Sequence, residues 1–238
     1  MEYREACRFL SPRSWLAKMP ANLRDAVLAA CTLPHFERGQ RVYSIGEPPT
    51  GLWGVVTGGF ALEFATGEHG PHFAHSFRPG MWFGEGESFE RRPHFTTIAA
   101  TRPSSCLHLP LSTLEAIART HPSIWRSVGI LAGAHVADAL GALSDGTIRD
   151  PLARIAAILL RLAGVRVHEH LSDPRPELDV TQEDLALLAN VSRGTVQTQL
   201  AQLESAGLVA RSYGRLQILD PERLRAAIEP PGSGSGNR

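Results

Sequence analysis

This sequence of 238 residues contains few cysteines and almost no lysine, and its net charge is zero. The three cysteines, Cys7, Cys31 and Cys106, are far apart, which excludes a disulfide framework, a CxxC pair and the clustered ligands of an iron–sulfur site. Lys18 is the only lysine, and 24 basic residues balance 24 acidic ones. A uniformly basic surface for nucleic acid is therefore excluded, whereas a local basic patch is not.

Long, uninterrupted apolar runs are also lacking. The most apolar stretches, residues 128–143 and 155–163, are interrupted by His135, Asp138 and Arg161, and neither approaches the ~20 residues that a membrane span needs. The N-terminal residues contain no apolar stretch typical of a signal peptide. Because 43% of the residues are hydrophobic and 20% are charged, the sequence predicts a globular protein that lies in the cytoplasm and contacts no membrane.

Spacings typical of metal or catalytic sites are lacking too. His69, His72 and His75 are separated by three residues each, so they cannot all lie on one face of a strand. Cys106 and His108 could share a strand face, which leaves haem or metal sensing as an alternative. We therefore expect no metal site and no catalytic residues, and the sequence identifies no cofactor.

The chain changes character near residue 121. Before it, five short β-type runs alternate with glycine and proline turns: residues 41–45, 52–56, 60–64, 73–77 and 96–101. This spacing is typical of a roll or sandwich of short strands. Short helices are predicted on either side of the strands, over residues 20–33 and 110–119. After residue 121, helical periodicity replaces the strand pattern.

Residues 122–143 carry an apolar seam on one face of a predicted helix. Its positions alternate by three and four residues: Trp125, Gly129, Ala132, Val136, Ala139 and Leu143. A heptad seam with such small residues predicts a close contact with a second copy of the chain. A neighbouring stripe that includes Ile124, Val128 and Leu131 would pack on the helix's own domain. An ordinary core helix buried on both faces is the alternative.

Two short helices and a hairpin are predicted near the C-terminus. Thr181 has the character of an N-cap with an acid three residues later, and Ser192 caps a second helix that ends near residue 206. Two strand-like runs, residues 208–212 and 215–219, then form a small hairpin with arginines at both shoulders. This order predicts a helix-turn-helix with a wing. A helical hairpin that merely packs is the alternative.

The residues predicted to contact DNA lie on the two helix caps, the second helix and the hairpin. They are Thr181, Ser192, Arg193, Gly194, Thr195, Gln197, Thr198, Gln202, Arg211, Tyr213 and Arg215. In the major groove, Arg193 is expected to pair with guanine and Gln197 with adenine. The capping hydroxyls and the hairpin residues are expected to contact phosphates, which position a protein without reading sequence. Glu204 is the only acid in this locally basic segment.

The order of roll, long helix and winged helix resembles the cyclic-AMP receptor and fumarate–nitrate regulator (Crp/Fnr) family of bacterial transcription factors. Residues 79–85 are similar to the family's Gly-x-x-Phe-Gly-Glu turn, and residues 181–186 and 192–196 are similar to its helix-turn-helix signature. The resemblance implies an α+β fold with a cyclic-nucleotide-binding-like β-roll (jelly roll), a dimerisation helix and a winged helix-turn-helix. The expected limits are residues 1–121, 122–147 and 148–229, followed by a disordered tail at 230–238.

The resemblance implies a homodimeric, sequence-specific transcriptional regulator that binds an inverted repeat in double-stranded DNA. RNA polymerase is a further candidate partner. A small-molecule-binding roll, or a roll-fold enzyme with a helical oligomerisation tail, is the alternative. In the recognition helix, Gly194 and Thr198 replace an acid and an arginine that are common in the family, so we expect a different operator.

The effector pocket implied by the resemblance comprises Trp82, Gly84, Glu85, Phe95, Thr96, Ala139 and Leu140. Glu85 matches a carboxylate that can hold a ribose hydroxyl. Phe95 and Thr96 fall where the family has an Arg-Ser pair for the phosphate, and a phenyl ring cannot neutralise a phosphate. Ala139 and Leu140 fall where polar residues would contact the base. Ordinary gating by cyclic AMP is therefore not expected.

Two alternatives concern the same pocket. Arg91 or Arg92 could replace the missing arginine if the loop were shifted inward. Four aromatic residues could line an apolar cavity for another ligand, or they could fill the core: Trp82, Phe83, Phe89 and Phe95.

Overall fold

The computed structural model describes residues 1–66, 69–166, 177–178, 180–212 and 215–228. Tyr213 and the predicted tail at 230–238 lie outside the described residues. The chain divides into two compact units within helix α5 (Ile124–Thr147), so that the first unit extends to Val136 and the second begins at Ala137.

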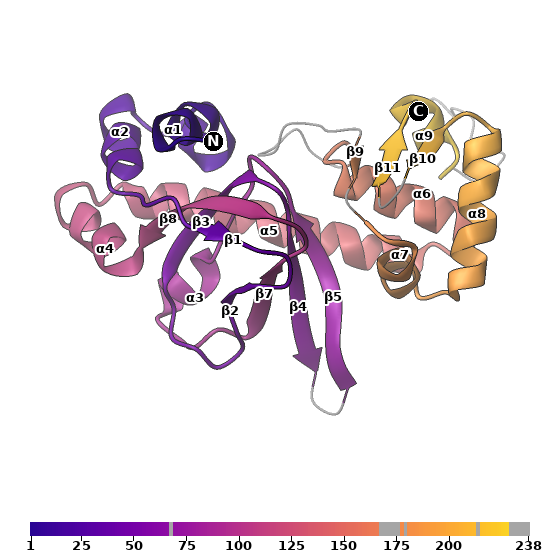
Figure 1. Ribbon diagram of the computed structural model, residues 1–238, viewed down its shortest axis with the longest axis horizontal. Coiled ribbons are helices and arrows are strands. Elements are labelled where there is room, and N and C mark those ends of the chain that lie inside the picture. The colour runs from indigo at the N-terminus through magenta and orange to yellow at the C-terminus, as the bar shows by residue number, and fades with distance from the viewer. Residues whose placement is uncertain (67–68, 167–176, 179, 213–214, 229–238) are drawn as a thin grey trace, which may run out of the picture. The chain divides into compact units, whose positions relative to one another are not determined.

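The first unit contains a β-roll of two four-stranded antiparallel sheets (Figure 1). The sheet with the order β1-β8-β3-β6 comprises His35–Phe36, Ser104–Pro110, Gly51–Thr57 and Trp82–Phe83. The sheet with the order β2-β7-β4-β5 comprises Arg41–Tyr43, Thr96–Ala100, Phe60–Thr66 and His69–Phe77. The five strand runs predicted from the sequence correspond to β2, β3, β4, β5 and β7, and the predicted fold class is confirmed.

Two hydrophobic cores stabilise this unit. Between the sheets, Phe60 packs among Phe36 and Phe83 with ring centroids 5.5 and 5.8 Å apart. The second core joins β3 and β6 to the N-terminal helices, where Trp15 and Trp82 meet edge-to-face at 5.4 Å. Buried aromatic pairs of this geometry contribute about 0.5–1.5 kcal/mol beyond their burial.

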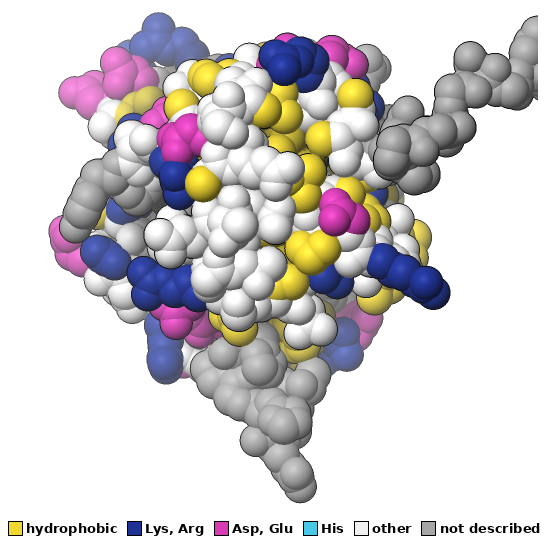
Figure 2. All heavy atoms as spheres, turned by 90° about the vertical axis from the view of Figure 1, so that its right-hand side faces the viewer, with side chains coloured by type: hydrophobic (Ala, Val, Ile, Leu, Met, Phe, Trp, Pro, Cys, Tyr) yellow, Lys and Arg dark blue, Asp and Glu magenta, His cyan; other side chains and the backbone are white. Residues whose placement is uncertain are grey.

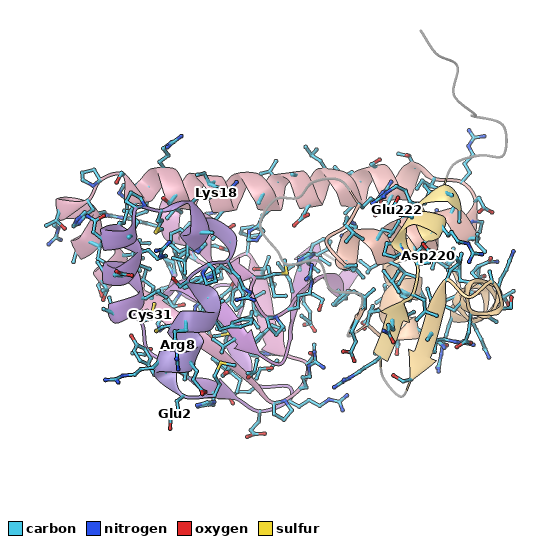
Figure 3. The ribbon with its side chains drawn as sticks, turned by 90° about the horizontal axis from the view of Figure 1, so that it is seen from above. Glu2, Arg8, Lys18, Cys31, Asp220 and Glu222 are labelled. Carbon is cyan, nitrogen blue, oxygen red and sulfur yellow. The ribbon has the colours of Figure 1, made fainter. Side chains whose placement is uncertain are left out.

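Five helical segments accompany the sheets. They are α1 (Tyr3–Leu10), η1 (Ser14–Lys18), α2 (Ala21–Ala29), α3 (Glu85–Glu90) and α4 (Leu111–Thr120). Arg8 lies on α1, and Cys31 follows the end of α2 (Figure 3). The sequence predicted α2 and α4, although α2 ends at Ala29 rather than at residue 33. The helices α1 and η1 were not predicted, although the buried residues Ala6 and Leu10 give α1 the four-residue apolar spacing of an amphipathic helix.

The second unit is a small helical domain with a three-stranded sheet. Its helices are α6 (Pro151–Leu162), α7 (Gln182–Ala189), α8 (Arg193–Ser205) and α9 (Pro221–Ala226). Its sheet has the order β10-β11-β9, from Val209–Ser212, Arg215–Ile218 and Glu177–Leu178. Asp150 caps α6 by accepting a 2.8 Å hydrogen bond from the Ala153 amide, and Pro151 occupies the first helical position.

A buried ion cluster connects the C-terminal half of α5 to α6. Asp145 is 1% exposed and accepts a 2.8 Å hydrogen bond from Nε of Arg161. Arg166 forms a second ion pair with the same carboxylate. Burial lowers the pKa of Arg161, while the charge of Asp138 acts in the opposite direction. Asp145 therefore pairs with two guanidinium groups in a largely dehydrated position, and the charge of Asp138 adds to the compensation at Arg161.

The helix α5 is more apolar than the sequence analysis allowed. By length and composition it is able to cross a membrane, since an 18-residue window has a mean hydropathy of 1.3, but core helices of soluble proteins meet the same criterion. Only 17% of that window is buried in the single chain. Ile124, Val128 and Leu131 pack into the core of the first unit, as predicted for the second stripe. The other face of α5 is exposed in the described part of the single chain.

Candidate nucleic-acid interface

The helix-turn-helix is fixed by paired caps. Thr181 and Asp184 form a capping box, in which the Thr181 hydroxyl accepts from the Asp184 amide at 3.1 Å and the Thr181 amide donates to the Asp184 carboxylate at 2.9 Å. Asn190 ends α7 in the left-handed conformation, with φ of 48°. Ser192 then caps α8 by accepting from the Thr195 amide at 3.1 Å. This local chemistry sets the turn between the two helices.

The outer face of α8 is polar and nearly uncharged. Val196, Leu200 and Leu203 are buried, whereas the predicted contact residues are exposed: Arg193, Gly194, Gln197, Thr198 and Gln202. Figure 2 shows the side on which α8 lies, where neutral atoms cover most of the surface and basic side chains form separate patches. Arg193 makes no ion pair within the described part of the chain, so its guanidinium is available to a ligand.

Packing within the described residues does not require a glycine at position 194. A Cβ at this position would meet only the Ser192 hydroxyl, at 3.7 Å, and the backbone is helical. Glycine costs about 1 kcal/mol of stability relative to alanine inside a helix. Its presence at position 194 suits the close approach of another molecule to the backbone of α8.

The wing arginines are already paired in the free protein. Arg211 donates from Nε to Glu204 at 2.9 Å, and its own amide donates to the other oxygen of that carboxylate at 3.2 Å. These hydrogen bonds lower the pKa of Glu204. Arg215 donates to Glu177 at 2.7 Å, with both side chains more than half exposed. The sequence analysis assigned both arginines to phosphates and did not find their carboxylate partners.

A cleft of about 320 Å³ brings several predicted contacts together in this unit. Its lining includes Thr181 and Gln182 at the start of α7, Arg193 at the start of α8, and Arg211 and Arg215 on the wing. Three arginines and one acid, Glu183, thus line one concave surface beside a helix N-terminus, and this excess of positive charge suits an anion such as a phosphate.

In the roll, Glu85 and Glu87 at the start of α3 are engaged by histidines. His135 Nδ1 lies 2.7 Å from Glu85 Oε1. His94 is fully buried, lies 3.6 Å from Glu87 Oε1 and stacks on Tyr43 with ring centroids 3.6 Å apart. Burial alone would raise the pKa of Glu87, but the proximity of His94 and the backbone amides lower it overall. Within the described residues, no group of three potential ligands could hold a metal ion.

Two family models match this chain. The cyclic nucleotide-binding domain matches residues 33–121, and the Crp-like helix-turn-helix domain matches residues 153–227. The chain belongs to the Crp/Fnr family of transcriptional regulators. The resemblance inferred from the sequence is confirmed, and members of this family bind DNA and act as dimers.

The relatives of this Crp/Fnr protein include regulators of similar length. A CRP-like cAMP-activated global transcriptional regulator of Mycobacterium tuberculosis is 24% identical over 189 residues, which are 79% of this chain and 84% of the relative. Glutaminase 2 of Bradyrhizobium diazoefficiens is 31% identical over 113 residues, or 48% of this chain, but the match spans only 17% of that enzyme. The structure of FixK2 from Bradyrhizobium japonicum has a TM-score of 0.70 at 16% identity, covers 85% of this chain and 99% of FixK2, and shows a shared fold.

The four aromatic residues near α3 do not line one cavity in this Crp/Fnr protein. Phe95 is 53% exposed and Phe89 is 62% exposed, while Trp82 and Phe83 are buried in two different cores. The prediction that these four residues line one aromatic cavity is wrong, because the short helix α3 and the turn after it place two of the rings at the surface. Thr96 is buried, and its hydroxyl lies 3.5 Å from Glu87.

The arginines near α3 are held at the surface. Arg91 forms an ion pair with Glu115 at 2.7 Å. Arg92 forms one with Glu90 at 2.6 Å and places its guanidinium 4.8 Å from the centre of the Phe95 ring. The alternative in which one of them turns into the roll is therefore not the observed arrangement. Gly84 has φ of 93°, and a Cβ there would lie 2.4 Å from a backbone oxygen, so this position requires glycine.

In the single chain, four of the six residues of the predicted α5 seam are exposed and two are half-buried. The exposed residues with heptad spacing are Gly129, Gly133, Val136, Leu140 and Leu143. Trp125 and Ala132 are half-buried instead, and Trp125 packs edge-to-face on Phe89 at 5.7 Å. Ala139 is exposed beside the stripe. Leu140, expected in an effector pocket, is 60% exposed on this face.

Some interacting residues of the roll were missed by the sequence analysis. His94 follows Glu87 by seven residues, but Tyr43 comes from a distant strand, and only the folded sheet stacks its ring on His94. His135 interrupts the apolar stretch of residues 128–143, and a polar residue at such a position was the available signal for a buried partner.

We expect replacement of Arg193 by lysine to weaken sequence discrimination more than overall affinity. Arginine can form two hydrogen bonds to guanine, and lysine keeps the charge without the planar fork. A good bidentate contact contributes about 1–3 kcal/mol of discrimination, or about 5- to 150-fold. The measurement is the ratio of dissociation constants for the selected site and for a site with the relevant base pair changed. A preserved ratio would contradict the assigned contact.

Proposed function

We propose that this chain is a cytoplasmic, homodimeric regulator that binds an inverted repeat in double-stranded DNA and is not gated by ordinary cyclic AMP. Its action is proposed to be binding rather than catalysis, with RNA polymerase as a further candidate partner. The observation that carries the proposal is Arg193, which lies on the exposed first turn of a capped recognition helix and makes no ion pair with the described residues. Two such helices in a dimer would meet half-sites about 34–36 Å apart.

The face of α5 supports the dimer. Val136, Leu140 and Leu143 are 57%, 60% and 71% exposed in the single chain. A continuous apolar stripe on a helix is unfavourable in water and is typical of an interaction surface. At Gly129 and Gly133, an added Cβ would meet no described atom of the same chain within 4 Å. A second α5 helix approaching closely would use the space at both glycines.

The chemistry of the roll supports independence from cyclic AMP. The carboxylate of Glu85, which would bind a ribose hydroxyl, is engaged by His135. The aromatic side chain of Phe95 replaces the expected arginine and is exposed. A cyclic phosphate entering near Glu85 and Glu87 would meet negative charge, which disfavours anion binding.

Selection of random duplex DNA at near-physiological salt tests the proposal. With no effector added, we expect the purified full-length protein to enrich one inverted repeat. Cyclic AMP at saturating concentration should change neither the enriched sequence nor the affinity. Enrichment only after cyclic AMP is added would overturn the ligand-independent part. No enrichment under either condition, together with turnover of a small molecule, would favour a roll-fold enzyme.

A further inference from the structure

We propose that Glu204 is a positioning residue that presents Arg211 of the wing to a DNA phosphate. This inference rests on the proposed function, since it requires that the second unit binds duplex DNA. Glu204 lies near the C-terminal end of α8 and Arg211 lies on β10. A cleft lined by three arginines, including Arg211, lies on the same unit.

The Glu204–Arg211 contact fixes both the side chain and the backbone of the wing. One carboxylate oxygen of Glu204 accepts from Nε and Nη2 of Arg211, at 2.9 and 2.5 Å. The other oxygen accepts from the Arg211 amide at 3.2 Å. Both side chains are partly exposed, at 29% for Arg211 and 38% for Glu204. The recognition helix and the first wing strand are thereby joined at one residue.

Arg211 retains donors after this pairing. A guanidinium has five N–H groups, and Glu204 engages two of its nitrogen atoms, which leaves Nη1 unused within the described residues. Arg211 also lines the cleft that contains Arg193 and Thr181. A phosphate in this cleft would meet a guanidinium whose position is already set, so binding would cost little side-chain entropy.

The exposed ion pair in the same sheet provides a matched control. Glu177 accepts a single 2.7 Å hydrogen bond from Nη1 of Arg215, with side chains 56% and 53% exposed. A single-contact surface pair of this kind constrains its arginine weakly. Both carboxylates carry the same charge and lie in the unit that carries the recognition helix, but of the two only Glu204 also holds the backbone amide of its arginine.

The direction in which Glu204→Gln changes the affinity for DNA distinguishes positioning of Arg211 from simple charge repulsion. Removal of a negative charge near DNA would tighten binding if electrostatics alone mattered. If Glu204 positions Arg211, we expect E204Q to weaken binding to the selected inverted repeat by about tenfold, the effect of removing roughly one charged hydrogen bond. The slope of the salt dependence should become shallower by about one for each phosphate that the protein no longer neutralises. E177Q should leave both quantities close to wild type.

A double-mutant cycle with Arg211→Ala completes the test. In the R211A background, E204Q should have no weakening effect, because the residue through which Glu204 acts is gone. Thermal unfolding of each variant monitors folding, and a purely structural defect would not change the salt slope. Tighter or unchanged binding by E204Q, or equal weakening in both backgrounds, would overturn the inference. If wild-type protein binds no duplex at all, the proposed function fails instead.

Discussion

Replacement of Asp145 by alanine is expected to destabilise the second unit by about 3–5 kcal/mol, since it removes the carboxylate that pairs with two largely buried arginines. Arg161 has only 5% of its side chain exposed, and Arg166 shares the same carboxylate. For a domain of about 100 residues, each kcal/mol shifts the melting temperature by about 4–8 °C. We therefore expect the far-UV circular dichroism transition of the second unit to fall by more than about 12 °C.

The distribution of tryptophan makes this measurement selective. All four tryptophans, Trp15, Trp53, Trp82 and Trp125, precede the boundary between the units. Their fluorescence reports on the first unit, whereas circular dichroism reports on both. D145A should move only the transition seen by circular dichroism. The exposed pair of Glu177 gives the control, since E177Q should cost well under about 1 kcal/mol. Equal shifts in D145A and E177Q would contradict a dominant role for burial.

Much of the fold was accessible from local patterns. Alternation of apolar residues and turn glycines predicted five strands. The capping residues Thr181 and Ser192 predicted where α7 and α8 begin. Both signals act over only a few residues. The segment η1 was missed for the opposite reason. Its Trp15 is buried against Trp82, a contact between positions far apart in sequence that no local period encodes.

The candidate sites were predicted less completely because they depend on side-chain partners. Periodicity predicted an interaction face of α5 that includes Ala132, whereas in the single chain Ala132 is half-buried and the neighbouring Gly133 is exposed. The structure settles the exposure of each by showing which side packs on the roll. Similarly, composition identified Glu204 as a lone acid among arginines without revealing that it engages Arg211.

Replacement of Gly133 by leucine is expected to have opposite effects on the helix and on the dimer. Within the described chain, the new Cβ meets no atom within 4 Å, and the helix gains about 0.5–1 kcal/mol in propensity. In a dimer, the same side chain would force apart two helices that approach at small residues. We expect sedimentation analysis to show a monomer at concentrations where wild type is dimeric.

Loss of the dimer should also abolish high-affinity binding to the inverted repeat. Two linked half-site contacts gain on the order of 10²–10⁴ in affinity over one, so G133L should weaken binding by at least about 100-fold while still contacting a half-site weakly. Ala116→Leu is the control, because Ala116 is an exposed helical position on α4, outside the α5 stripe, and it receives the same leucine side chain. A116L should remain dimeric and bind DNA as wild type does. A dimeric G133L variant with full affinity would place the interface on another surface of the protein.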